Sequence, residues 1–216
     1  MRREMEERKK LCGYYNYTVV LTYLGMLMGF TGIVLVTEGK YREAVICLMI
    51  SGICDMFDGT VAATKQRDVR EKQFGIQIDS LSDLICFGIL PALLTYSISG
   101  KTYLSFLTAA LYVLCALIRL AYFNVMEEER QEKEGGRRAW YLGLPVTAAA
   151  LVVPVCYMIE NKLAYGGTLQ TVLVMMAVAF VLPIKIKKPY LAGKIGIIFT
   201  GVVEFVILLL GLGLEV

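Results

Sequence analysis

Seven apolar stretches divide the chain, and each is long enough, or nearly so, to cross a lipid bilayer. They lie at Tyr15–Val36, Tyr41–Thr64, Phe74–Ile98, Thr102–Met126, Leu142–Ile159, Thr168–Ile184 and Tyr190–Leu214. A spanning helix needs about 20 mostly apolar residues, and the fifth and sixth stretches are the shortest. Because a segment in lipid must satisfy its own backbone hydrogen bonds, the stretches predict helices. The predicted fold is an all-α, polytopic transmembrane helix bundle.

The composition supports one membrane domain over residues 1–216. Of the 216 residues 57% are hydrophobic, and the mean hydropathy of +0.61 excludes an ordinary soluble domain. The longest polar segment, Glu127–Trp140, predicts a helical extension of the fourth span followed by a turn at Gly135-Gly136. The charged start, MRREMEERKK, does not resemble a cleaved signal peptide.

The basic residues predict the orientation in the membrane. Most of the 22 lie in the N-terminal tail and in the connections after the second, fourth and sixth spans. The opposite connections hold only Lys40, Arg42, Lys101 and Lys162. Positive charge favours the cytoplasmic side, so we expect a cytoplasmic N-terminus in the inner cell membrane. Nucleic-acid binding is not expected, because the basic residues are spread over four short segments.

Four of the five aspartates, Asp55, Asp58, Asp79 and Asp83, stand inside apolar sequence. An ionised carboxylate is costly in a hydrocarbon setting unless a cation or donor compensates it. The first two are three residues apart and the last two are four apart, so each pair projects from one helix face. The second and third spans run antiparallel from a shared cytoplasmic loop. The two pairs are therefore expected to face each other near the cytoplasmic side.

The residue types around these acids predict a site for two divalent cations, Mg²⁺ or Mn²⁺. The chain has no histidine, and its six cysteines form no CxxC pair and are expected to be free, packed thiols. With no thiol expected nearby, the four carboxylates make an all-oxygen site, which hard cations prefer. Two-metal sites recur in enzymes that displace groups at phosphorus. A cation transporter is the competing interpretation of intramembrane acids.

The aspartates belong to a longer motif, Asp55-x-x-Asp58-Gly59-x-x-Ala62 followed by Gly75-x-x-x-Asp79-x-x-x-Asp83. It resembles the signature of the CDP-alcohol phosphotransferase family. The segments FGIQIDSLSDLICFGILPA, CALIRLAYFN and YLGLPVTAAA resemble the phosphatidylserine synthase branch, and the resemblance covers about residues 14–160. It implies a six-helix catalytic core plus about one extra span, and a homodimer.

The resemblance also implies an activity and residue roles. Serine would attack the lipid-bearing phosphorus of CDP-diacylglycerol, and CMP would leave. Asp55, Asp58 and Asp79 would be metal ligands, while Asp83 would be both a ligand and the base that takes the serine hydroxyl proton. Residues expected to bind the CDP-lipid are Asn16, Gly59, Ala62, Lys72 and Gly75. Glycerol phosphate or inositol phosphate remains an alternative acceptor, because the motif binds only the shared CDP-lipid.

Two departures from the family pattern affect this interpretation. Ala63 stands where the signature has an arginine, and the gap to Gly75 is three residues longer. The missing arginine would supply positive charge near the nucleotide. Lys65, Arg67 or Lys72 is then expected to compensate, or else the chain is a catalytically impaired homologue.

Three polar residues in the later spans have no place in the motif. Arg119 is interpreted either as a structural partner of an acid or as the cation that recognises the serine carboxylate or a lipid phosphate, with Asn124 assisting. Glu204 is alone in the last span and is interpreted as a packed structural acid.

The one-sided distribution of basic residues gives a testable orientation. A single cysteine label introduced within Thr64–Gln73 should react with a membrane-impermeant reagent only from the cytoplasmic side, because that loop carries a cluster of basic residues. Labelling of this loop from outside intact cells would contradict the orientation.

Overall fold

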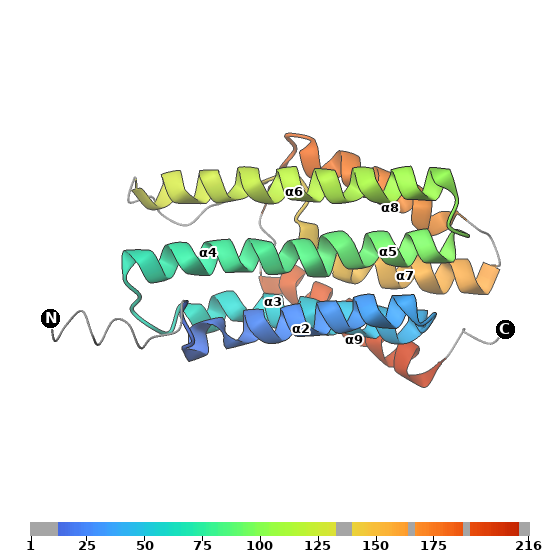
Figure 1. Ribbon diagram of the computed structural model, residues 1–216. Coiled ribbons are helices and arrows are strands. Elements are labelled where there is room, and N and C mark those ends of the chain that lie inside the picture. Colours follow the sequence, from blue (N-terminus) through green and yellow to red (C-terminus); the bar gives the residue numbers. More distant parts are fainter. Residues whose placement is uncertain (1–12, 133–139, 164–166, 188–190, 212–216) are drawn as a thin grey trace, which may run out of the picture.

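The chain begins its bundle with an antiparallel helical hairpin, as the first two apolar stretches predict. The computed structural model describes residues 13–132, 140–163, 167–187 and 191–211. Helix α2 (Tyr17–Thr37) begins at Asn16, whose side chain accepts a hydrogen bond from the Thr18 amide. The turn that ends it uses Gly39 at φ +76°, a conformation that glycine adopts without strain. Helix α3 (Tyr41–Ala62) then returns beside α2 (Figure 1).

The third predicted span is one rod built of three helical pieces. Helix α4 (Val69–Asp83) passes into the π-helical turn η1 (Leu84–Ile89) and then into α5 (Leu90–Ile98), and the three lie in line in Figure 1. The rod begins at Val69 rather than at the predicted Phe74, because the Asp68 side chain caps it by accepting from the Glu71 amide.

The π-helical turn has a local cause in Pro91. Proline has no amide hydrogen, so the Phe87 carbonyl four residues earlier loses its usual helical partner. The hydroxyl of Tyr112, on helix α6 (Tyr103–Glu132), donates to that carbonyl at 2.9 Å. Tyr112 is fully buried, so a side chain from a neighbouring helix satisfies the irregular turn.

The C-terminal third departs from the predicted spans. The fifth was expected over Leu142–Ile159, but strand β1 (Trp140–Leu142) and the 3₁₀ turn η2 (Val146–Ala148) precede helix α7 (Ala149–Leu163). Helix α8 (Thr168–Val181), strand β2 (Lys185–Lys187) and helix α9 (Leu191–Leu210) follow. Helix α8 ends before Ile184 because Pro183 does not continue a helix.

A short antiparallel pairing of β1 with β2 is the exception to the all-α prediction. Tyr141 lies opposite Ile186 in this two-stranded sheet. The pairing joins the segment after α6 to the segment after α8. The topology predicted from the sequence places both segments on the cytoplasmic side. The observed pairing of β1 with β2 agrees with that prediction.

Four described helical segments are long and apolar enough to cross a membrane: Tyr17–Thr37, Tyr41–Ala62, Val69–Ile98 and Tyr103–Glu129. This confirms a polytopic membrane helix bundle. The three later apolar segments are helical but shorter in their uninterrupted apolar part, and their crossing stays a prediction. Helix α6 runs on to Glu132, as the predicted extension of the fourth span requires.

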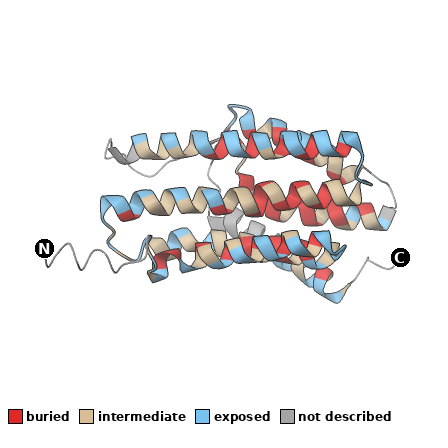
Figure 2. Ribbon diagram, viewed as in Figure 1, coloured by how far each residue is buried: buried red, intermediate tan, exposed pale blue. Residues whose placement is uncertain are grey.

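Buried side chains gather in one half of the bundle, on the α5 and α7 side, whereas α4 is mostly intermediate or exposed (Figure 2). The largest fully buried side chains include Phe87, Leu90, Leu94, Tyr112 and Phe180. Large apolar side chains on α2 and α6 stay exposed, for example Phe30 and Leu114, as lipid contact requires.

The thiol prediction is confirmed for the cysteines that the structure describes, which are all free: Cys47, Cys54, Cys86, Cys115 and Cys156. Cys12 lies outside the described residues. Glu204 is only 5% exposed, which agrees with a packed acid, and its Oε2 has no hydrogen-bond partner within the described parts of the chain.

Close contact between α2 and η1 depends on Gly29. A β-carbon at this position would lie 3.1 Å from the Cα of Cys86, which is backbone and has little room to move. Gly29→Ala should therefore destabilise the bundle by roughly 1–3 kcal/mol, the usual cost of overpacking. A lower melting temperature in detergent would show it. Gly196→Ala is the control, because a β-carbon there meets nothing within 4 Å. Equal melting temperatures for both variants would contradict this view of the interface.

Candidate active site

The four intramembrane aspartates come together in one cleft between α2, α3 and the α4–η1 segment. Asp55 and Asp58 reach it from α3, and Asp79 and Asp83 reach it from α4. The cleft has about 190 Å³ of empty volume, part of it open to solvent. The predicted juxtaposition of the two pairs is therefore present in the structure. The pairing arises because α3 and α4 are antiparallel and both pack against α2, and each aspartate pair occupies a single helix face.

The carboxylates are close enough to share a cation. One oxygen from each of Asp55, Asp58 and Asp79 lies within 4.8 Å of the other two. Across the two helices the Asp55 side chain interacts with that of Asp83, and the Asp58 side chain with that of Asp79. Carboxylates with like charge repel each other at this range unless something positive or protonated lies between them.

Helix α2 supplies the wall opposite the acids. Thr22 donates from Oγ1 to Oδ2 of Asp58 at 3.1 Å and so fixes the orientation of that carboxylate. Two further hydroxyls bond to the backbone of α2. Ser51 donates to the Gly25 carbonyl at 2.9 Å, and Ser82 donates to the Thr22 carbonyl at 3.4 Å. Sequence reasoning missed these residues. The small residues Gly25, Gly29 and Gly32 on one face of the first span were the available signal that this face approaches other helices.

The expectation of no nearby thiol was wrong. Cys86 lines the cleft one turn beyond Asp83, because the helical rod continues through η1 on the same face. Its Sγ donates to the Gly25 carbonyl at 3.3 Å, and it lies 3.9 Å from the Ser82 hydroxyl. The thiol is thus engaged with the backbone of α2, and the carboxylates remain the oxygen donors of the cleft.

The donor set fits hard divalent cations. Within the described residues the ion pairs link Lys40 to Glu38 and Lys65 to Glu71, and neither involves the cleft. Four clustered carboxylates in an apolar bundle need positive charge to remain ionised. Carboxylate oxygens suit Mg²⁺ and Mn²⁺ better than softer ions. The cluster could therefore bind divalent metal.

The small residues of the motif leave open space beside the acids. Gly59 is exposed, and a β-carbon there would meet nothing within 4 Å. Ala62 ends α3, and Ala63 caps it with an exposed side chain. Gly75 lies one turn before Asp79 on α4, and the guanidinium of Arg67 lies against it. Lys72 is exposed on the first turn of α4. Apart from Asp79, none of these residues is among those that line the cleft itself.

Arg119 and Asn124 link helix α6 to neighbouring segments of the structure. Arg119, only 7% exposed, donates from Nε to the Leu144 carbonyl at 3.3 Å and lies over the Phe123 ring at 5.5 Å. Asn124 accepts from the Ser80 hydroxyl at 2.6 Å and donates to Gln77 at 3.4 Å. Asn124 thus attaches α6 to α4 next to Asp79. Neither residue is among those that line the cleft.

A comparison with protein families matches residues 15–200 to the CDP-alcohol phosphatidyltransferase model. The chain belongs to the CDP-alcohol phosphatidyltransferase family. The match extends past residue 160, where the resemblance seen in the sequence weakens, and so includes α8 and the beginning of α9.

Relatives with serine in their names support the phosphatidylserine synthase branch. The chain is 30% identical to archaetidylserine synthase of Methanothermobacter thermautotrophicus over 88% of this chain and 76% of the relative. It is 32% identical to the CDP-diacylglycerol–serine O-phosphatidyltransferase of Saccharomyces cerevisiae over 67% of this chain, and 29% identical to that of Helicobacter pylori over 68%. It spans only 56% and 60% of the length of the latter two.

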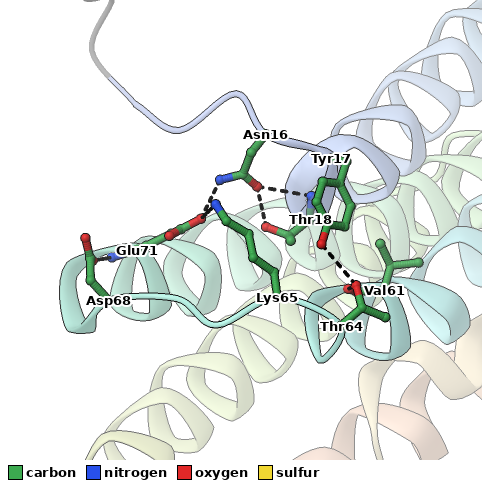
Figure 3. A network of polar contacts seen from close by, with 8 residues as sticks. All are labelled: Asn16, Tyr17, Thr18, Val61, Thr64, Lys65, Asp68 and Glu71. Atoms are coloured by element: carbon green, nitrogen blue, oxygen red, sulfur yellow. Dashed lines mark hydrogen bonds and ion pairs between the residues drawn. The ribbon is translucent and has the colours of Figure 1, made fainter.

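Next to the family motif, a polar network ties α2 to the beginning of α4 (Figure 3). Asn16, expected to bind the CDP-lipid, donates from Nδ2 to Glu71 while its Oδ1 caps α2. Lys65 donates to the same Glu71 oxygen at 2.8 Å, and the Glu71 side chain is buried. The structure thus gives Asn16 and Lys65 structural partners on the side of α4 where the rod begins.

The buried position of Glu71 predicts a stability effect. Glu71→Gln should lower the melting temperature of the purified protein, because it leaves the Lys65 ammonium without its carboxylate in a half-buried place. Glu38→Gln removes the matched but exposed pair with Lys40 and should change little. Equal effects of the two substitutions would show that the network does not stabilise the α2–α4 junction.

Proposed function

We propose that this protein transfers a phosphatidyl-type group from a CDP-lipid to the hydroxyl of L-serine and releases CMP. Family membership and the serine-specific names of the relatives support this reaction. The observation that carries the proposal is the single cleft in which two carboxylate pairs from α3 and α4 face each other. The relatives named above are not named for a phosphorylated acceptor or for cation transport. They therefore do not support these two alternative functions.

In this proposal the aspartates divide into two roles. Asp55, Asp58 and Asp79 would hold two divalent cations, Mg²⁺ or Mn²⁺, with Asp83 as a further ligand. When bound, such cations neutralise the diphosphate and stabilise the entering and leaving oxygens of a displacement at phosphorus. Thr22 keeps the Asp58 carboxylate oriented toward the cleft.

Asp83 is proposed as the base. The serine hydroxyl oxygen forms a bond to the lipid-bearing phosphorus, and the bond from that phosphorus to the CMP oxygen breaks. The hydroxyl proton passes to Asp83, and CMP leaves with the electron pair of the broken bond. Asp83 lies beside Asp55 and directly before the π-helical turn, and it is half-buried. A base at this position is partly shielded from bulk water, and proton transfer to a placed carboxylate is a usual component of catalysis.

The cleft is proposed to face the cytoplasm. In Figure 1 the beginnings of α2 and α4 and the ends of α3 and α6 lie at one end of the bundle. The basic connection between α3 and α4 lies at this end, which supports the predicted orientation. Asp58 stands one turn from the end of α3, so soluble serine would reach the acids from that side. The homodimer implied by family resemblance stays a prediction.

The lipid part of the donor has two candidates. Relatives from yeast and Helicobacter carry CDP-diacylglycerol in their names, whereas the relative that matches 88% of this chain is an archaetidylserine synthase. We propose diacylglycerol as the lipid, because the yeast and Helicobacter relatives are named for it. The archaeal ether lipid is the second candidate, because the proposed site in the acidic cleft binds the diphosphate that both donors share.

The decisive experiment measures CMP release by the purified protein. CDP-diacylglycerol and its archaeal ether analogue are each supplied with serine, glycerol phosphate or inositol phosphate. Serine should support release, and excess chelator should abolish it until Mg²⁺ or Mn²⁺ is restored. Binding of Mn²⁺, followed by its paramagnetic resonance signal, should weaken in Asp55→Asn. Release without serine dependence, or full activity in excess chelator, would overturn the proposal.

Substitution of single aspartates separates the two roles. Asp83→Asn keeps one oxygen but does not accept the proton, so turnover should fall by about 10²–10⁴, the usual contribution of a general base. Affinity for the CDP-lipid in saturating Mg²⁺ should change little. Asp55→Asn should weaken both metal and CDP-lipid binding. If Asp83→Asn loses binding as severely as Asp55→Asn, Asp83 is mainly a ligand, and normal turnover would remove it from the mechanism.

A further inference from the structure

Arg67 lies in the connection between α3 and α4 and places its guanidinium against Gly75. A β-carbon on Gly75 would lie 3.0 Å from Nη1 of Arg67, so the guanidinium occupies the space that the glycine leaves open. Gly75 precedes Asp79 by one helical turn and shares its face. Arg67 is therefore held over the face of α4 that leads into the acidic cleft.

The other basic residues of this stretch are differently placed. Lys65 is paired with Glu71 at 2.8 Å. Arg70 and Lys72 are exposed on the first turn of α4. Arg67 is half-buried, yet no hydrogen bond or ion pair of its guanidinium occurs among the described residues. A partly buried cation without an anion is unfavourable, because it loses hydration and forms no ion pair that would compensate for the loss.

A guanidinium in this setting is suited to a phosphate. It is planar, remains charged, and offers paired donors that match two phosphate oxygens. Gly59 leaves open space on α3 for a bulky anion, while Gly75 leaves the space on α4 that the guanidinium itself fills. Ala63, at the end of α3, brings no charge to this region.

We propose that Arg67 binds the diphosphate of the nucleotide-lipid donor beside Gly75, and so supplies the positive charge that Ala63 does not. This inference rests on the proposed function and assigns Arg67 to donor binding, with no part in proton transfer. The same chemistry would also bind the phosphate of an anionic lipid headgroup, and the experiment separates these two sources.

The test compares Arg67→Gln, Arg67→Lys and the control Arg70→Gln in the full chain, purified in neutral detergent. Binding of CDP in saturating Mn²⁺ is measured by calorimetry, and KM and kcat are measured for donor and serine. Arg67→Gln should raise the Kd for CDP and the KM for the donor about tenfold, the effect of one charge-assisted hydrogen bond. The kcat and the KM for serine should change little. Arg67→Lys should recover part of the affinity, and Arg70→Gln should match the wild type.

The outcomes distinguish the alternatives. Unchanged CDP affinity, together with weaker binding of a short-chain anionic lipid added to the detergent-purified protein, would overturn the proposal in favour of a headgroup contact. Should Arg67→Gln fail to fold, Arg67→Met decides, because it keeps an unbranched side chain and removes the charge; wild-type CDP affinity in that variant would overturn the proposal. If the wild type makes no product with serine, the proposed function fails, and CDP binding still reports on Arg67.

Discussion

The confinement of four carboxylates within an apolar bundle is the constraint on which the rest of this structure depends. Asp55 and Asp58 face Asp79 and Asp83 across one cleft. Their mutual repulsion and their loss of hydration both oppose folding. A site of this kind is maintained when a bound cation lowers its energy, so the arrangement implies a ligand-binding function more strongly than a structural one.

The backbone around the cleft is irregular for identifiable reasons. Glycines on α2 let η1 approach closely, and Cys86 lies so near Gly29 that a larger residue would not fit there. Pro91 interrupts the amide ladder of the rod, and Tyr112 from α6 satisfies the carbonyl that is released. The π-helical turn begins directly after Asp83, so the same features set the rotation of that residue relative to the buried half of the bundle.

Lys65, Arg67 and Arg119 are buried or half-buried cations that differ in their partners. Lys65 is paired with the buried Glu71, which also joins Asn16 to α4. Arg119 donates to the backbone of the segment before α7. Arg67 lies against Gly75, and its charge is uncompensated among the described residues. Charge alone is similar in the three side chains, and the position of their neighbours decides which of them serve the fold.

The amino-acid sequence by itself determined the membrane class, the helical hairpin of the first spans and the facing pairs of aspartates. These follow from local rules, because hydropathy, helical spacing and alternating topology need only nearby residues. Only the tertiary structure decided that Cys86 lines the cleft, that Thr22 orients Asp58, and that Asn16 and Asn124 join helices. Such contacts connect residues far apart in the chain. They depend on how closely and at what rotation the helices pack, which no local pattern specifies.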